Sequence, residues 1–367
     1  MNKDTRKYID IYKKIIDKIL ANANKIGVSS PNAAKDGVKY DCRIPRNWVS
    51  GFWPGLLLKA YKATGDDSVL GLIRDCEKRM DEALSQPLTL HHDTGFMWYL
   101  SSVVDYKLTG YEENKKRGLI AAIILASRFN PKGNYIRAWN SFGNGVDYTG
   151  WVIIDCMINI ELLYWASAEI GDSRFKNIAN AHAQTVMNNF IRDDGTVRHV
   201  VEFDSESGEV KGYHPGQGYS ENSAWTRGAG WAIYGFAKAY AYSGNREFID
   251  TAIKCAKTFM TYFNKLGFIP CDFLSPSEPC YHDSSAAAVA ACGMLEIAKH
   301  LSDDASEEFK GYSLSLIDML DSKYADYSLD TEPLLKGATH AYNSNQNIGL
   351  IYGDYYFAEA LENLLQL

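Results

Sequence analysis

The sequence predicts an all-α protein whose helices form a closed (α/α)6 barrel of six helix hairpins. Six strongly apolar helical segments recur along the chain, and an amphipathic segment rich in Lys, Asp and Glu precedes each of them. We expect the apolar helices to form an inner ring and the amphipathic helices an outer ring. The apolar segments are spaced by roughly 45 to 80 residues, which is too uneven for an open solenoid of identical repeats. A single barrel domain over residues 1–367 is therefore predicted.

The first three inner helices are each expected to start at a glycine followed by an aromatic residue and to end at a turn containing glycine. They are GFWPGLLLKAYKATGD from residue 51, GFMWYLSSVVDYKLTGY from 95 and GWVIIDCMINIELLYWASAEIGD from 150. Their amphipathic outer partners are predicted to begin near residues 5, 67 and 112. Each pair therefore has the pattern of an outer helix followed by an inner one.

The last three hairpins follow the same order. Their inner helices are GWAIYGFAKAYAYSGN from residue 230, SSAAAVAACGMLEIAKHLSD from 284 and YGDYYFAEALENLL from 352. Their outer partners are predicted to begin near residues 173, 246 and 304. Six outer and six inner helices complete the two predicted rings.

Two connections between an outer helix and the following inner helix are unusually long. They span residues 132–150 and 193–228, and both are rich in glycine and aromatic residues. The second contains valines and a GTV/GEV alternation that is compatible with a short hairpin. Loops longer than about 12 to 15 residues are usually functional or disordered. We expect these two loops to wall a functional cleft.

The composition excludes several classes of protein. A net charge of −7 and scattered basic residues argue against a nucleic-acid partner. No run of about 18 apolar residues is present, so no membrane span is predicted. The seven cysteines form no C-x-x-C pair, and the charged N-terminus lacks the apolar core of a signal peptide. We therefore expect a cytoplasmic protein with reduced thiols, while the sequence leaves the oligomeric state open.

Asp155 is the strongest candidate for a catalytic residue, because it lies in the almost wholly apolar segment 150–166. Burial disfavours an ionised carboxylate, and a poised acid in a dry cleft suits proton-transfer catalysis. If this segment is helical throughout, Trp151, Asp155 and Asn159 share one face. The alternative is a structural Asp that is hydrogen-bonded to a neighbouring helix.

Asp93 is the second candidate acid. It lies in HHDTGFMW, directly before the second inner helix, where Asp93 or Thr94 can instead serve as a helix cap. If the ring closes, the inner helices start at one mouth, and Asp93 and Asp155 project into one cavity. Glycosidases typically use two carboxyl groups that face one cleft for acid and base catalysis.

Further polar and aromatic side chains are predicted at the same rim. His199 and Gln217 lie in the loop 193–228, and Arg227 and Trp231 are one helical turn apart, so that the guanidinium can stack on the indole. The alternative is that Arg227 only ties down the loop.

Two tryptophans in predicted loops are candidates for sugar stacking. These are Trp48 in RNWVSGFWPG and Trp139 in RAWN. Aromatic rings also fill protein cores, but a half-exposed loop tryptophan has few structural reasons to be there.

No metal or cofactor is predicted. His91 and His92 are adjacent and therefore poorly placed to chelate one ion, and no H-x-x-x-H accompanies them. The chain also has no P-loop, no G-x-G-x-x-G after a strand and no G-x-S-x-G nucleophile motif. Nucleotide, redox and serine-nucleophile chemistry therefore lack their usual residues.

Together, HHDTGFMW, GWVIIDCMINIELLYWA, WTRGAGWAIYGF and IYGDYYFAEAL resemble, in this order along the chain, the unsaturated glucuronyl hydrolases of glycoside hydrolase family 88. The resemblance covers essentially the whole chain. It implies an (α/α)6 barrel acting on oligosaccharides that polysaccharide lyases leave with a 4,5-unsaturated uronic acid at the non-reducing end. The related unsaturated rhamnogalacturonyl hydrolases share the barrel and the two aspartates, and are the alternative.

The resemblance also implies residue roles. It makes Asp155 the general acid and base, and it makes Asp93 the residue that binds and orients the unsaturated sugar. It implies that the following residues lie in or beside the pocket: Trp48, His92, Trp139, His199, Gln217, Arg227 and Trp231. Some family members that favour sulfated disaccharides carry Ser-x-x-Ser-x-Lys near the C-terminus. Here the corresponding loop, HAYNSNQNIG at 340–349, has no Lys, which puts a preference for 6-sulfated substrates in doubt.

Three other functions fit parts of the sequence. An ordinary inverting glycosidase on the same barrel would also use two carboxylates. A sugar epimerase would rely on paired histidines such as His92 and His199. A non-catalytic carbohydrate-binding protein would tolerate the loss of an acid at position 155.

Overall fold

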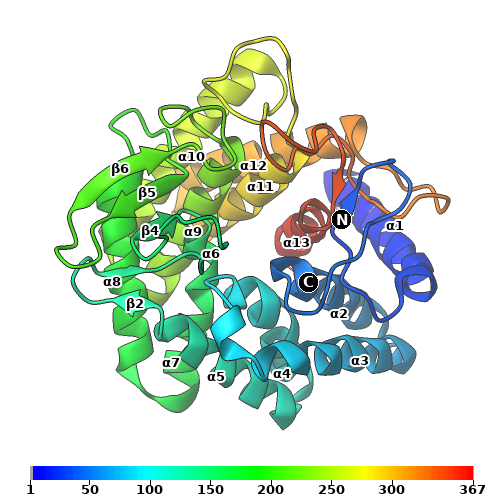
Figure 1. The fold of residues 1–367 in the computed structure, drawn as a ribbon. Coiled ribbons are helices and arrows are strands. Elements are labelled where there is room, and N and C mark those ends of the chain that lie inside the picture. The colour runs from blue at the N-terminus through cyan, green and yellow to red at the C-terminus, as the bar shows by residue number, and fades with distance from the viewer. Residues whose placement is uncertain (1–2, 367) are drawn as a thin grey trace.

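The computed structural model describes residues 3–366 and confirms the predicted (α/α)6 barrel (Figure 1). In the described chain six outer helices alternate with six inner helical segments. The outer helices are α1 (Lys3–Ile26), α3 (Asp67–Leu84), α5 (Glu112–Ala126), α8 (Ser173–Phe190), α10 (Arg246–Leu266) and α12 (Asp303–Lys323). Their starts agree closely with the amphipathic pattern of the sequence.

The inner segments close into a ring because the last one, α13 (Ile351–Leu365), packs against both the first and the fifth. The others are α2 (Phe52–Thr64), the π-helix η3 (Gly95–Val103) continued by α4 (Val104–Thr109), the short α6 (Cys156–Asn159) continued by α7 (Glu161–Ile170), α9 (Thr226–Ser243) and α11 (Ser284–Lys299). α11 is buried from Ser284 to Ala298, as expected for an inner helix.

Close packing of α9 on α11 depends on a glycine. A Cβ atom on Gly293 would lie only 2.8 Å from the backbone nitrogen of Tyr234, so any larger residue would force the two helices apart. The small side chains of α11 therefore let neighbouring inner helices approach at their backbones.

The third inner segment differs from its prediction, because its first residues are not helical. Trp151–Ile153 form strand β4, which pairs antiparallel with β5 (Val200–Phe203), and β5 pairs with β6 (Val210–His214). Aromatic and β-branched residues favour a strand over a helix, and here a partner strand is available. The predicted helical face that joins Trp151 to Asp155 is therefore wrong, whereas the predicted hairpin in the loop 193–228 is confirmed.

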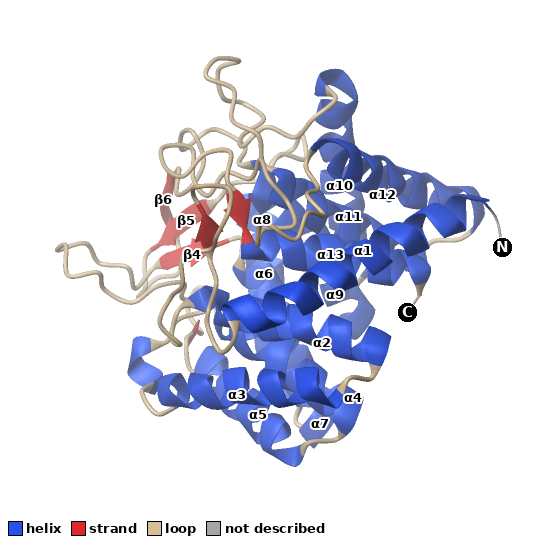
Figure 2. Cartoon of the chain, turned by 90° about the vertical axis from the view of Figure 1, so that its right-hand side faces the viewer, coloured by secondary structure: helices blue, strands red, loops and turns tan. Residues whose placement is uncertain are grey.

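All long connections lie on one face of the barrel. Outer helices lead to inner helices through long segments, whereas inner helices lead to outer helices through turns such as 65–66 and 244–245. Figure 2 shows the loops and the β4–β5–β6 sheet gathered beyond the helix ends on one side. The short elements of this face are β1 (Ala33–Ala34) with β7 (Gly349–Leu350), β2 (Phe129–Asn130) with β3 (Tyr135–Ile136), η1 (Trp48–Gly51) and η2 (Pro87–Thr89). The starts of the inner helices therefore open toward this loop face.

Within residues 3–366 no helix combines the length and the apolar character that crossing a membrane requires. All seven cysteines are unpaired thiols, and five of them are buried.

Candidate active site

A cavity of about 420 Å³ opens on the loop face, above the starts of the inner helices. Seven of the nine predicted site residues line it: Trp48, Asp93, Trp139, Asp155, His199, Gln217 and Arg227. His91, Phe142, Tyr148, Trp151, Ile153, Gly216 and His340 complete the lining. The structure thus brings together residues that lie far apart in the sequence, including both candidate acids.

Asp93 lies just before the start of the π-helix and has three polar neighbours, Asn159, His91 and His92. Its Oδ1 accepts a hydrogen bond of 3.1 Å from Asn159 Nδ2, and its Oδ2 lies 3.1 Å from His91 Nδ1. Burial raises the pKa of Asp93, but interactions with His92, His91 and Asn159 outweigh it, so the pKa lies below its ordinary value. Asp93 is therefore ionised at neutral pH.

Asp155 occupies the turn between β4 and α6, and 14% of its side chain is exposed to the cavity. Its Oδ2 lies 3.3 Å from Nε2 of His199. The other ring nitrogen, His199 Nδ1, accepts a hydrogen bond of 2.8 Å from the backbone N–H of Gln217. In the neutral imidazole the proton therefore sits on Nε2, which faces the Asp155 carboxylate.

Asn159 connects the two acids. Its Nδ2 donates to Asp93 Oδ1 and, at 3.3 Å, to the backbone carbonyl of Asp155, while its Oδ1 accepts from the backbone N–H of Phe96 at 2.8 Å. One buried amide thus fixes the start of the π-helix relative to the turn that carries Asp155. This bridge explains how two carboxylates from different hairpins face one cavity.

Gly216 sets the position of His199. It adopts a φ of +57°, and a Cβ atom there would lie 2.1 Å from His199 Nδ1. We expect Gly216→Ala to displace the imidazole and to lower kcat/KM at least about tenfold, because small misplacements near reacting groups are costly. Steady-state kinetics on purified protein would measure this. Gly212→Ala is the matched control, because a Cβ there meets nothing within 4 Å; equal losses in both variants would contradict this role of Gly216.

Aromatic rings form one wall of the cavity. Trp139 lies about 6 Å, centroid to centroid, from three other rings, namely 6.1 Å from Phe142, 6.2 Å from Tyr148 and 6.0 Å from Trp151. Trp48 lies 5.1 Å from Tyr352. Both predicted tryptophans are half-buried, as expected for side chains that offer a ring face to a sugar.

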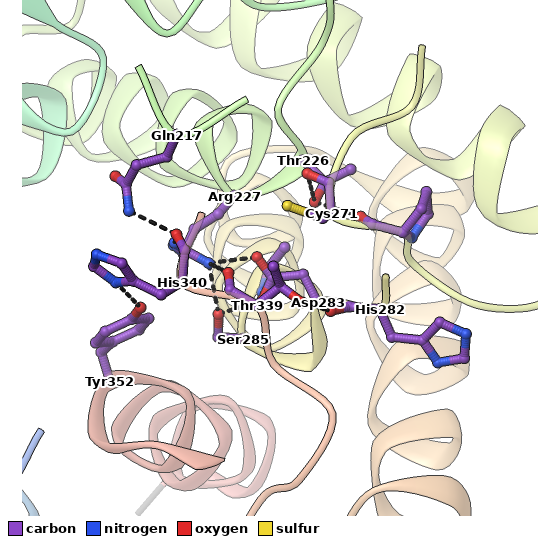
Figure 3. A network of polar contacts seen from close by, with 12 residues as sticks. Gln217, Thr226, Arg227, Cys271, His282, Asp283, Ser285, Thr339, His340 and Tyr352 are labelled. Carbon is purple, nitrogen blue, oxygen red and sulfur yellow. Dashed lines mark hydrogen bonds and ion pairs between the residues drawn. The ribbon is translucent and has the colours of Figure 1, made fainter. Parts of the chain in front are cut away.

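Arg227 is more enclosed than the sequence indicated. Its guanidinium lies 4.5 Å from the Trp225 ring and 5.1 Å from the Tyr352 ring, so the predicted stacking on Trp231 is wrong. It forms a buried ion pair with Asp283 and donates to Ser285 Oγ at 3.2 Å (Figure 3). Arg227 therefore ties the loop face together as well as lining the cavity.

Two predicted site residues do not line the cavity. Trp231 is 1% exposed and packs against Phe96 and Tyr356, because its position on α9 points it into the core. His92 is fully buried behind Asp93, with its Nε2 3.4 Å from Asp93 Oδ1, and burial lowers its pKa to about 4.

His91 and His92 are better placed to bind one ion than their adjacency in the sequence predicts, so that prediction is wrong. Ligand atoms of His91, His92 and Asp93 lie within 4.8 Å of one another, because the turn before the π-helix directs both rings toward the carboxylate. These are two nitrogen donors and one oxygen donor, and His92 is neutral above about pH 4. Three such donors are a set that a transition metal can accept.

The chain is similar to known enzymes along most of its length. The model of Glycosyl Hydrolase Family 88 matches residues 11–315. The unsaturated glucuronyl hydrolase of Bacillus sp. (strain GL1) is 33% identical over 354 residues, which cover 94% of this chain and 93% of the relative. The unsaturated chondroitin disaccharide hydrolase of Streptococcus pyogenes serotype M1 is 35% identical over 341 residues, or 90% of this chain and 84% of the relative.

A solved structure of an unsaturated glucuronyl hydrolase with dGlcA-Glc-Rha-Glc has a TM-score of 0.91 at 32% identity, and the alignment covers 96% of this chain and 95% of the other. Both the sequence and the fold therefore match the same family. The chain belongs to glycosyl hydrolase family 88 and is a glycosidase.

Proposed function

We propose that the protein releases the 4,5-unsaturated uronic acid from the non-reducing end of oligosaccharides that polysaccharide lyases produce, by hydration of the C4=C5 bond. The observation that carries this proposal is the Asn159 bridge, which holds the carboxyl-bearing residues Asp93 and Asp155 at one cavity. Relatives named for unsaturated glucuronyl and chondroitin substrates support glycosaminoglycan-type oligosaccharides as the substrate class.

The chemistry follows from the double bond. A C4=C5 bond conjugated to the ring oxygen is a vinyl ether, which accepts a proton at C4 and develops oxocarbenium character at C5. Protonated Asp155 supplies this proton, and the carboxylate that remains then takes a proton from the water that adds to C5. The resulting hemiketal opens, and the glycosidic bond breaks without direct attack on the anomeric carbon. The acid is regenerated, because one proton is consumed and one is released.

The neighbouring groups orient this reaction. The Nε2–H of His199 faces Asp155 Oδ2 at 3.3 Å and favours the orientation in which this oxygen points toward the imidazole. Ionised Asp93 accepts hydrogen bonds from sugar hydroxyls and stabilises positive charge that develops at C5. Trp48 and Trp139 offer ring faces to the sugar. The loop 340–349 offers no Lys to a sulfate group, so we expect no preference for a 6-sulfated substrate. A cytoplasmic location stays a prediction.

The absorbance of the conjugated double bond and the fate of solvent atoms test this function. With unsaturated disaccharides from chondroitin, hyaluronan and heparin, we expect the ultraviolet absorbance to fall. In D₂O, deuterium should enter C4 of the product, and ¹⁸O-labelled water should deliver its oxygen to C5. NMR and mass spectrometry on one reaction mixture measure both. An inverting glycosidase would instead place ¹⁸O on the anomeric carbon and keep the double bond, and this outcome would refute the proposal.

EDTA should leave activity unchanged, because protonation at C4 and addition of water need only an acid and a base. The measurement is the initial rate after dialysis against chelator, compared with mock-dialysed enzyme. The cluster of His91, His92 and Asp93 is where a required ion would bind. Loss of activity that a divalent cation restores would contradict the mechanism.

A further inference from the structure

The segment around His340 is held at the cavity by two side chains, Gln217 and Arg227, that lie more than 100 residues earlier in the chain (Figure 3). The backbone carbonyl of His340 accepts a hydrogen bond of 2.6 Å from Arg227 Nη2 and another of 2.7 Å from Gln217 Nε2. The carbonyl of Thr339 accepts a third, of 2.8 Å, from Arg227 Nη1. In addition, the backbone N–H of Tyr342 donates to the carbonyl of Gln217 at 2.9 Å. Four hydrogen bonds to Gln217 and Arg227 therefore fix the backbone around His340.

The anchor of this network is itself buried. Arg227 is 2% exposed and Asp283 is fully buried, and their ion pair is joined by Ser285. Breaking such a pair is costly because it leaves an unpaired buried charge. Much of the hydrogen-bonding capacity of Arg227 is thus committed to protein groups, and Gln217 Nε2 already has a protein acceptor. Both side chains act on the position of the 339–340 backbone.

The side chain held in this way lines the cavity. The His340 imidazole is half-buried, and its Nδ1 lies 3.4 Å from the hydroxyl of Tyr352. Burial lowers the pKa of His340 to about 4, and the positive charges of Arg227 and Arg43 act in the same direction. Burial also raises the pKa of Tyr352, so its hydroxyl keeps its proton and can donate to Nδ1. The imidazole is then neutral, with its proton on Nε2.

We propose that His340 is a further substrate-binding residue, which donates a hydrogen bond from Nε2 to an oxygen of the unsaturated sugar, and that Gln217 and Arg227 are positioning residues for it. This inference rests on the proposed function. It differs from the sequence-based expectation, in which Gln217 and Arg227 contact the sugar themselves. A neutral donor suits a cavity that also holds two carboxyl groups, because it adds a hydrogen bond without pairing with either acid.

Kinetics of His340 variants test the binding role. His340→Ala keeps the backbone carbonyl that Gln217 and Arg227 hold, and is expected to raise KM about tenfold with kcat nearly unchanged. His340→Gln, whose side-chain amide can donate from a similar place, should recover most of this loss. Asn343→Ala, at an exposed position of the same loop, is the control and should match the wild type. A KM for His340→Ala within twofold of wild type would overturn the proposal.

A double-mutant cycle tests the positioning role. Gln217→Ala should raise KM severalfold in the wild type and less than about twofold in the His340→Ala background. Equal factors in the two backgrounds would overturn it, because Gln217 would then act independently of His340.

Binding of an unsaturated chondroitin disaccharide, followed by fluorescence of the cavity tryptophans, separates this inference from the proposed function. If the wild type binds the disaccharide without removing its double bond, the proposed hydration activity is refuted. The Kd values of the His340 variants then still test whether His340 binds the sugar. If the wild type does not bind the disaccharide at all, both the proposed function and the proposed role of His340 are refuted.

Discussion

Asp155→Asn is expected to lower turnover of an unsaturated disaccharide at least about 100-fold, because an amide can neither donate nor recover the proton. The fold should persist, since Asn has nearly the same shape and its side-chain oxygen can face His199 Nε2 in place of the Asp155 carboxylate. Substrate affinity should change little for the same reason. The decisive measurements are kcat from the ultraviolet assay and Kd from tryptophan fluorescence.

Asp250→Asn is a matched control for this variant. Asp250 is exposed on the outer helix α10, so the same change of one charge there should leave kcat and Kd unchanged. Circular dichroism and thermal unfolding of both variants should resemble the wild type. A well-folded Asp155→Asn protein with near-native turnover would remove Asp155 from the role of proton donor.

The helical part of the fold was predictable because it depends on local pattern. Each amphipathic helix such as α10 and each apolar helix such as α11 carries its own periodicity, and the alternation of the two types indicates two rings. Strand β4 was not predictable in this way. Its residues Trp151–Ile153 read as the start of an apolar helix, and only the distant pairing partner β5 makes them a strand.

The site was partly predictable, for a related reason. Asp155 and Asp93 stand out as acids next to apolar segments, but the amide of Asn159 that joins them requires knowledge of the packing. His340 carries no signal in the sequence, since a single histidine in a polar loop is ordinary. Its place in the cavity depends on hydrogen bonds from Gln217 and Arg227, which lie more than 100 residues earlier in the chain.

Phe142 and Tyr148 line the cavity but were not predicted as site residues. Their loop was predicted to wall the cleft, and it contains several aromatic residues. Nothing in their spacing distinguishes rings that line a cavity from rings that fill a core. Trp231 illustrates the converse error. It lies one turn after Arg227, yet Trp231 packs against Phe96 and Tyr356 in the core, whereas Arg227 stacks on Trp225.

Asp93→Asn is also expected to lower kcat/KM by about 100-fold. The cause differs from that in Asp155→Asn, because this variant loses the orientation of the sugar and the negative charge near C5, not the proton donor. The pKa of Asp93 lies below its ordinary value, so this residue is a carboxylate over the working pH range and stabilises positive charge at C5. An Asn at position 93 keeps an oxygen for Asn159 Nδ2 but replaces the charge beside His91 by a neutral amide.

The pH dependence of kcat/KM distinguishes the two aspartates. Because Asp93 titrates below the working range, Asp93→Asn should lower the whole profile and keep the limb that reports the catalytic acid. Asp155→Asn should abolish that limb in the residual activity. The measurement is a full pH profile of both variants beside Asp250→Asn, with binding of the disaccharide followed at each pH. If the limb disappears with Asp93 and survives in Asp155→Asn, the two roles are reversed, and Asp93 supplies the proton while Asp155 orients the sugar.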